Sequence, residues 1–123
     1  MMKMLKSKVL FLVGMVALLW GVEIADTLSH HLLDNLGAIR PRTQFGLAQI
    51  FSAPFLHLGW QHLIGNTLAL IPLGALMLVQ RAFVPVMLIS IVVGGLGTWA
   101  FSTSASLGFS GVLFGFMGFL LAR

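Results

Sequence analysis

Ser110 lies between glycines in the motif Gly108-Phe109-Ser110-Gly111, at the start of an apolar stretch that runs almost to the end of the chain. A serine between glycines is typical of a nucleophile held at a tight turn into a helix. No charge follows until Arg123, so the helix that this turn opens is expected to lie in a membrane. The motif is weak by itself, because glycine and serine are both frequent in membrane helices.

His62 and Asn66 are polar residues in a second apolar segment. Their spacing of four places both side chains on one face of a helix, about a turn apart. Polar groups at membrane depth are costly unless they face the protein interior or a water-filled cavity. The pair alone leaves interhelical hydrogen bonding open as an alternative to chemistry. A metal site built on His57 and His62 is a further alternative, although no carboxylate or Cys accompanies them on this face.

Composition sets the class of protein. Hydrophobic residues make up 59% of the 123 residues and charged residues 8%, which excludes an ordinary soluble domain. The seven basic residues mostly flank apolar runs, so the net charge of +4 indicates membrane topology and not nucleic-acid binding. The chain has no Cys, which excludes disulfides, thiolate chemistry and Cys-based zinc sites.

Four membrane segments are predicted, at about 5–24, 59–79, 83–101 and 110–122. The first is interpreted as a retained helix and not a cleaved signal peptide, because no small-x-small cleavage site follows it. The last covers only about 20 Å, which is short of a hydrocarbon core about 30 Å thick. Residues 25–56 or so are predicted to form a structured loop that lies partly in the membrane interface. The His30-His31 pair falls in this loop, where a solvated or interfacial role is the simpler interpretation.

The positions of the basic residues predict which ends of the membrane segments face the cytoplasm. The N-terminal lysines, Arg81 and Arg123 fall on one side, which the positive-inside rule makes cytoplasmic, although Arg40 and Arg42 on the other side count against it. The prediction is a multi-pass integral membrane protein of the bacterial plasma membrane with a cytoplasmic N-terminus. Ser110 and the polar pair of the second segment then meet near the outer face. A nucleophilic oxygen and two hydrogen-bond donors at one depth are the groups that acyl transfer needs.

The order of these residues along the chain resembles that of the rhomboid family of intramembrane serine proteases. The similarity extends over roughly 37–123, and the ordered combination is much more specific than any single motif. It rests on two strings: His57-x4-His62-x3-Asn66, then Gly108-x-Ser110-Gly111.

The resemblance implies a role for each residue. Ser110 is the nucleophile, and the oxyanion hole is formed by His62, Asn66 and the backbone N–H of Ser110. His57 matches a family histidine that supports the connection between loop and helix. Phe114 falls where many members carry a Tyr that packs on the catalytic His, and a Phe keeps the ring without the hydroxyl.

A serine nucleophile also needs a base, which rhomboids take from a His on a later helix, usually the sixth. No His follows His62 in this chain. The expectation is therefore an all-α polytopic membrane protein with a rhomboid-like helix bundle, in which about four of six transmembrane helices are present and 1–123 is a partial rhomboid domain. Its expected partners are transmembrane protein substrates, the lipid bilayer and the missing C-terminal helices of the same protein, with no nucleic acid. No cofactor and no metal is implied.

Gly111, Gly115 and Gly118 lie on one face of the last helix, and the first two have a small-xxx-small spacing. In the family this face meets the helix that carries the catalytic His, so we expect it to lack that partner here. Packing against the second or third membrane segment remains an alternative.

The function expected from these residues is that of an intramembrane serine endopeptidase that cleaves transmembrane substrates near the outer membrane face. Residues 1–123 alone are expected to be inactive, because the base is absent. The alternative is a non-catalytic rhomboid-like membrane protein that binds membrane clients.

Overall fold

The computed structural model describes all 123 residues and consists of helices and their connections. In chain order the elements are α1 (Met2–Leu28), α2 (Leu32–Gly37), α3 (Gln44–Gln49), the 3-10 turn η1 (Ala53–Phe55), α4 (Trp60–Val79), α5 (Phe83–Phe101) and α6 (Ser110–Leu121). Three helices, α1, α4 and α5, are long and apolar enough to cross a membrane, whereas α6 has 12 residues. The chain is therefore an all-α polytopic membrane protein.

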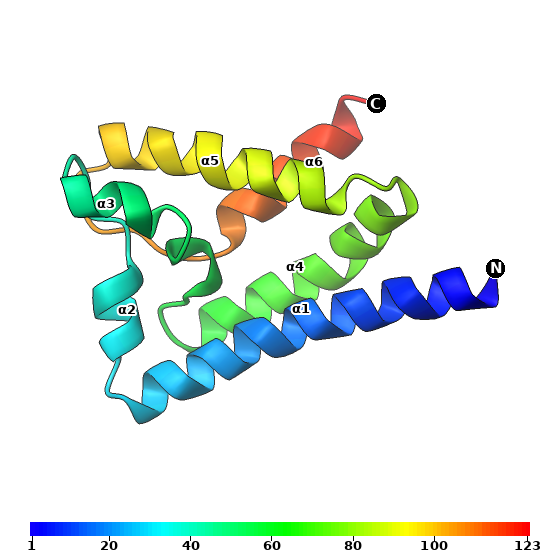
Figure 1. Cartoon of the computed structure of the whole chain (residues 1–123), viewed down its shortest axis with the longest axis horizontal. Coiled ribbons are helices and arrows are strands. Elements are labelled where there is room, and N and C mark those ends of the chain that lie inside the picture. Colours follow the sequence, from blue (N-terminus) through cyan, green and yellow to red (C-terminus); the bar gives the residue numbers. More distant parts are fainter.

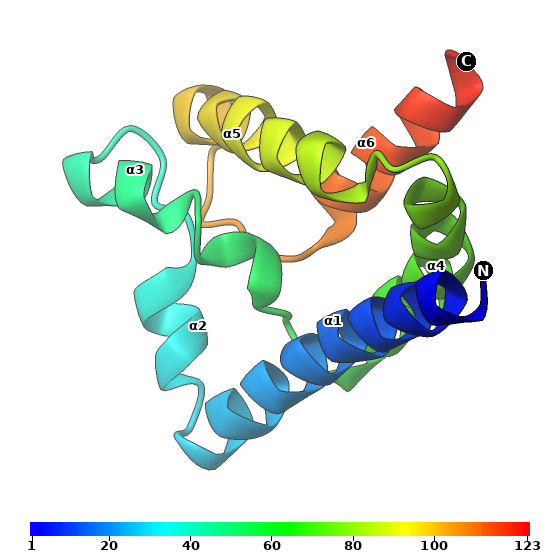
Figure 2. The same ribbon diagram turned by 45° about the vertical axis from the view of Figure 1, so that its right-hand side comes forward.

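The long helices run back and forth, with α1 antiparallel to α4 and α4 antiparallel to α5 (Figure 1). α6 packs against both α4 and α5. The two termini and the turn between α4 and α5 lie toward one end of the molecule, and α2 lies toward the other end in both ribbon views (Figures 1 and 2). Basic residues at the termini and in the α4–α5 turn are thus gathered at one end.

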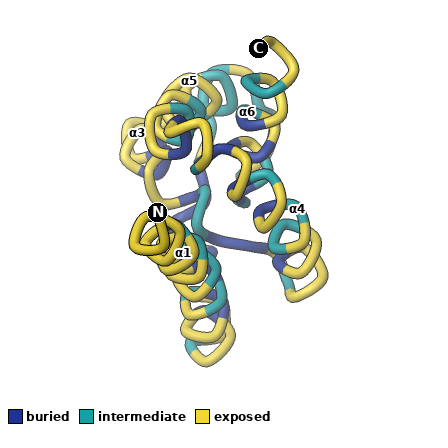
Figure 3. Tube along the Cα trace, turned by 90° about the vertical axis from the view of Figure 1, so that its right-hand side faces the viewer, coloured by how far each residue is buried: buried dark blue, intermediate teal, exposed yellow.

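Aromatic side chains join the helices at the end where α5 begins. Phe83 is almost fully buried, and its ring lies 5.0 Å from that of Phe11 on α1 and 4.8 Å from that of Phe116 on α6. Only 24 of the 123 residues are buried, and the outward faces of the long helices are exposed along most of their length (Figure 3). Apolar faces of this kind are stable in contact with lipid chains, since the helices satisfy their own backbone groups.

The first helix is longer than the sequence analysis expected. It runs to Leu28, whereas the predicted segment ended near residue 24. Glu23 lies near the end of the predicted segment and Asp26 in the predicted loop, yet both are buried on the last turns of α1. The carboxylate of Asp26 bonds to His31 and to the backbone N–H of Asp34, so the last turn of α1 is tied to the connection that follows.

The connection between α1 and α4 is a compact structure built around the buried side chain of Gln49. Its amide nitrogen donates to the carbonyl of Leu36 at 2.7 Å, and its amide oxygen accepts from the backbone N–H of Arg40 at 3.1 Å. The hydroxyl of Ser52 donates to the carbonyl of Gly37 at 2.8 Å. These bonds fasten α3 and η1 to the end of α2, because each satisfies a backbone group that the short helices leave free.

Arg42 has a structural role at the end of α5. Its guanidinium donates to the carbonyls of Ala100 at 3.3 Å and Ser102 at 2.8 Å. A cation at a helix C-terminus is favourable, since unpaired carbonyls concentrate negative partial charge there. This contact accounts for a basic residue at the end of the molecule opposite the N-terminal lysines.

Candidate active site

The turn that leads into Ser110 is held by backbone hydrogen bonds from the α1–α4 connection. Ile39 donates to the carbonyl of Ser106 at 2.7 Å, and Ser106 donates back at 3.1 Å. The N–H of Gly108 donates to the carbonyl of Ala53 at 2.8 Å. Gly108 adopts a φ of 122°, a conformation in which a side chain would be strained. The first glycine of the motif is therefore required by the shape of the turn.

Ser110 is the first residue of α6 and is half-buried. Together with Gly108 and Gly111 it lines a cavity of about 320 Å³ between α5, α6 and η1. The wall of the cavity also carries the hydroxyl-bearing residues Ser90 and Thr98 of α5. The three motif residues are thus brought to one polar-walled space.

Asn66 is held by a histidine from the preceding loop. Its side-chain nitrogen lies 2.9 Å from Nε2 of His57, which is completely buried. Burial lowers the pKa of His57 to about 4, so the ring is neutral near pH 7 and Nε2 can accept this hydrogen bond. A neutral ring that accepts at Nε2 carries its proton on Nδ1, which is buried without a hydrogen-bond partner. The amide of Asn66 keeps its second N–H for another acceptor.

His62 lies one turn before Asn66 on α4, and its side chain is exposed. Neither His62 nor Asn66 lines the cavity of Ser110, and no hydrogen bond joins either of them to the serine. Direct packing of α4 on α6 nevertheless places the two sets of residues on neighbouring helices. The structure therefore shows two groups, Ser110 with its glycines and Asn66 with His57, and does not join them in one pocket.

The glycine face of α6 is partly covered by α5. A Cβ at Gly115 would collide with the hydroxyl of Ser90, whereas Gly111 and Gly118 have open space where a side chain would go. The expectation of a face without a partner thus fails at Gly115, where packing against the third membrane segment takes its place. Phe114 is 70% exposed on the same helix.

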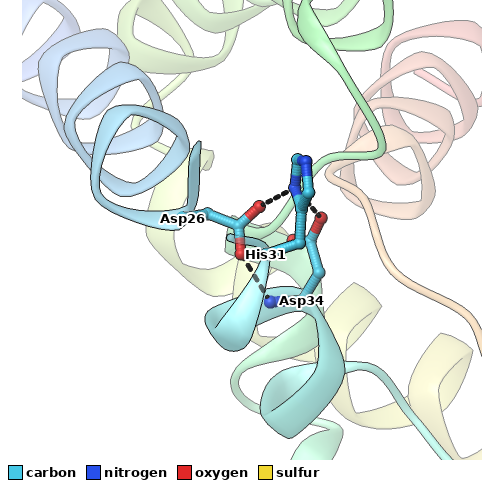
Figure 4. A group of neighbouring side chains, drawn as sticks. All are labelled: Asp26, His31 and Asp34. Atoms are coloured by element: carbon cyan, nitrogen blue, oxygen red, sulfur yellow. Dashed lines mark hydrogen bonds and ion pairs between the residues drawn. The ribbon is translucent and has the colours of Figure 1, made fainter. Parts of the chain in front are cut away.

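Sequence reasoning missed a cluster of ionisable residues at the end of α1. Nδ1 of His31 lies 2.8 Å from a carboxylate oxygen of Asp26 and 3.8 Å from one of Asp34 (Figure 4). The hydrogen bond that His31 donates to the carboxylate of Asp26 raises the pKa of His31. Burial and the nearby carboxylate of Asp26 raise the pKa of Asp34 to about 7. The only signal in the sequence was the presence of acidic residues on both sides of the His30-His31 pair.

The fold and the serine turn define a polytopic membrane protein with a candidate nucleophile at the start of a short helix. The Rhomboid domain family matches residues 44–123. The chain therefore belongs to the rhomboid family.

Related proteins occur in mycobacteria. The uncharacterized proteins Mb1372 of Mycobacterium bovis and Rv1337 of Mycobacterium tuberculosis are each 43% identical to this chain over 115 residues, which is 86% of this chain and 48% of theirs. The uncharacterized protein ML1171 of Mycobacterium leprae is 39% identical over 114 residues, or 85% of this chain and 45% of its own. The chain spans about half the length of the curated relatives it matches. No solved structure matches it.

The buried neutral state of His57 predicts a specific dependence of stability on pH. Because burial lowers the folded-state pKa of His57 from 6.5 to about 4, the unfolded chain binds an extra proton between these values. The contribution of His57 to stability is therefore complete above about pH 6.5 and declines as the pH falls toward 4. We expect wild type to lose stability relative to His57→Phe over this range, as measured by reversible unfolding in mixed micelles. The exposed His30→Phe is the control, and equal pH profiles for wild type and His57→Phe would contradict the assignment.

Proposed function

We propose that this protein acts as an intramembrane serine endopeptidase of rhomboid type, cleaving transmembrane protein substrates near the outer membrane face. The observation that carries the proposal is the position of Ser110, which a glycine turn holds at the start of α6 beside a polar-walled cavity. Membership of the rhomboid family supports the same reaction. The proposal concerns the full-length protein and its substrates, of which these 123 residues are one part.

In the proposed reaction, the hydroxyl oxygen of Ser110 attacks the carbonyl carbon of a substrate peptide bond. The hydroxyl proton passes to a base, and the carbonyl oxygen becomes negatively charged. The backbone N–H of Ser110, at the first position of α6, has no partner within the helix and is available to this oxyanion. Hydrogen bonds aimed at charge that develops in the transition state lower the barrier.

Asn66 is the proposed side-chain donor, together with His62. One amide hydrogen of Asn66 is occupied by His57, which leaves the other free and holds the amide plane in one orientation. His57 is thus proposed as a positioning residue for Asn66. This role is more specific than the support of the loop that the family resemblance implied.

The proposed base lies outside residues 1–123. His57 has one ring nitrogen bonded to Asn66 and the other buried, and His30 and His31 lie in the connection between α1 and α2. His62 is the proposed second side-chain donor to the oxyanion, so it is not proposed as the base. We propose that a histidine on a further helix reaches Ser110 by packing where Gly111, Gly118 and the exposed Phe114 leave space on α6.

We further propose that the N-terminus is cytoplasmic in the plasma membrane of a bacterium. The termini and the α4–α5 turn lie toward one end of the molecule (Figure 1). These segments carry Lys3, Lys6, Lys8, Arg81 and Arg123. Positive residues are retained on the cytoplasmic side during insertion, so Ser110 is placed toward the outer side.

A non-catalytic client-binding protein of the same family is the second candidate. One observation favours it, namely that His62 and Asn66 do not line the cavity that Ser110 lines. A binding protein needs no oxyanion hole at its serine.

The first prediction concerns the nucleophile. The full-length protein in detergent should react with a fluorophosphonate, and Ser110→Ala should abolish the labelling because the attacking oxygen is gone. Ser90→Ala is the matched control, since it removes another hydroxyl from the wall of the same cavity and should leave the labelling intact. Undiminished labelling of Ser110→Ala rules out the proposed nucleophile, and absence of labelling in wild type favours the client-binding alternative.

The second prediction concerns the oxyanion. Asn66→Ala should lower kcat for a model transmembrane substrate by about 10²–10³, the loss typical of one oxyanion donor. Gln61→Ala changes an exposed residue of the same helix and should retain the wild-type rate. If Asn66→Ala turns over at the wild-type rate, Asn66 is not part of the mechanism.

The third prediction concerns the base. Residues 1–123 alone, purified in detergent, should not cleave the model substrate, since the chain holds no histidine free to accept the proton of Ser110. Cleavage is measured by the appearance of the product fragment on a gel, with the full-length protein as positive control. Product formation by residues 1–123 that disappears in Ser110→Ala would disprove an external base.

A further inference from the structure

The side chains of Asp26, His31 and Asp34 converge where α1 ends and α2 begins. Asp26 comes from the last turn of α1, His31 from the intervening turn and Asp34 from the first turn of α2. One potential metal-ligand atom from each residue lies within 4.8 Å of the other two. Figure 4 shows the imidazole ring of His31 directed toward both carboxyl groups.

Asp26 is satisfied by the protein, since its carboxylate accepts from the backbone N–H of Asp34 and pairs with His31, but two neighbouring buried carboxyl groups are not. Asp34 is only 6% exposed, and neither of its carboxyl oxygens has a hydrogen-bond partner. Glu23, one turn before Asp26 on α1, is also buried and has an unpaired Oε1. A buried carboxylate without a partner is costly, and burial with the nearby Asp26 raises the pKa of Asp34 to about 7. A bound cation could replace the proton of Asp34 and give the unpaired oxygens a partner.

His31 cannot satisfy all of these carboxyl groups. Its hydrogen bond goes to Asp26 at 2.8 Å, and Asp34 is farther away at 3.8 Å. One imidazole ring faces three carboxyl groups, and no lysine or arginine forms an ion pair with any of them. A bound divalent cation would balance the charge and give the free oxygens of Asp34 a partner.

The types of ligand atom in this cluster, one imidazole nitrogen and carboxylate oxygens, determine which cations it can bind. Ca²⁺ and Mg²⁺ prefer oxygen ligands alone, whereas imidazole nitrogen combined with carboxylate oxygen suits Zn²⁺ and its neighbours among the transition metals. Tetrahedral bonds of about 2.1 Å to zinc place ligand atoms about 3.4 Å apart. The separations of 2.8 and 3.8 Å from His31 Nδ1 lie on either side of this value. The side chain of His31 is 58% exposed, which leaves a path from solvent and a position for water on the metal.

We propose that Asp26, His31 and Asp34 form a binding site for a divalent transition-metal cation of the zinc class, with the charge of Glu23 beside it. Binding at this site joins the end of α1 to α2, and α2 is fastened through Gln49 and Ser52 to the segments that hold the turn before Ser110. The site lies outside the cavity of Ser110, whose lining includes none of the three ligands. Its role is structural, and it is independent of whether Ser110 is catalytic.

The test is titration of the full-length protein, without a histidine tag and after treatment with a chelator, with ZnCl₂ in an isothermal calorimeter. We expect saturation at one Zn²⁺ per chain and a rise in the midpoint of thermal unfolding. His31→Asn should weaken binding by at least about tenfold, because loss even of a residue that only supports a ligand costs 10–100-fold in metal affinity.

His30→Asn is the matched control. Both histidines have left-handed backbone conformations, with φ of 57° and 64°, and asparagine tolerates this region. His30→Asn should bind Zn²⁺ as wild type does. Absence of saturable binding to wild type overturns the proposal. Equal binding by wild type and His31→Asn also overturns it, since the zinc would then lie elsewhere, for example at His57 or His62.

A second variant addresses the carboxylates. Asp34→Asn keeps the size of the side chain and removes its charge, so it should reduce zinc affinity without lowering the thermal stability of the metal-free protein. If Asp34→Asn fails to fold, the comparison between the two histidine variants still decides the outcome. The same titration with MgCl₂ should give no saturation, and Mg²⁺ binding as tight as that of Zn²⁺ would contradict the transition-metal assignment.

Discussion

The backbone hydrogen bonds between the α1–α4 connection and the turn before α6 are the constraint on which the site depends. Ile39 and Ser106 bond to each other in both directions, and Ala53 accepts from Gly108. In a membrane, backbone groups outside helices must find partners within the protein, because lipid offers none. A segment far away in the sequence therefore determines where Ser110 lies, and the connection between the first two long helices is part of the site and not a tether.

Polar side chains inside this protein differ in how well they are satisfied. Gln49 uses both ends of its amide, and Asn66 is bonded to a buried neutral His57. In contrast, Asp34 and Glu23 are buried with unpaired oxygens. The satisfied groups fix the loop and the orientation of Asn66, since a paired buried polar group restricts its neighbours to one arrangement. The unpaired oxygens of Asp34 and Glu23 lie at or beside the proposed metal site, whereas the unpaired Nδ1 of His57 lies on the ring that orients Asn66.

Much of the architecture follows from local sequence patterns. Gln80 and Arg81 interrupt two long apolar runs, and the structure places α4 and α5 on either side of them. Contacts between distant residues leave no such pattern. The close contact of Gly115 with Ser90 depends on how α5 and α6 pack, and the hydrogen bond from Asn66 to His57 depends on how the loop enters α4. Residue spacing along one segment determines neither. The burial of the acidic residues at the end of α1 could not be predicted, because a buried carboxylate and a solvated one look alike in a sequence.

The contact between Gly115 and Ser90 limits how α6 can move. At Gly115 the side chain of Ser90 fills the space that a methyl group would need, while the faces at Gly111 and Gly118 are open. This contact lies near the middle of α6, about 7.5 Å along the axis from Ser110. Tilting α6 about this point moves Ser110 and the far end of the helix in opposite directions. A change in tilt at the last turn of α6 would therefore be opposed by the backbone hydrogen bonds that hold the turn before Ser110.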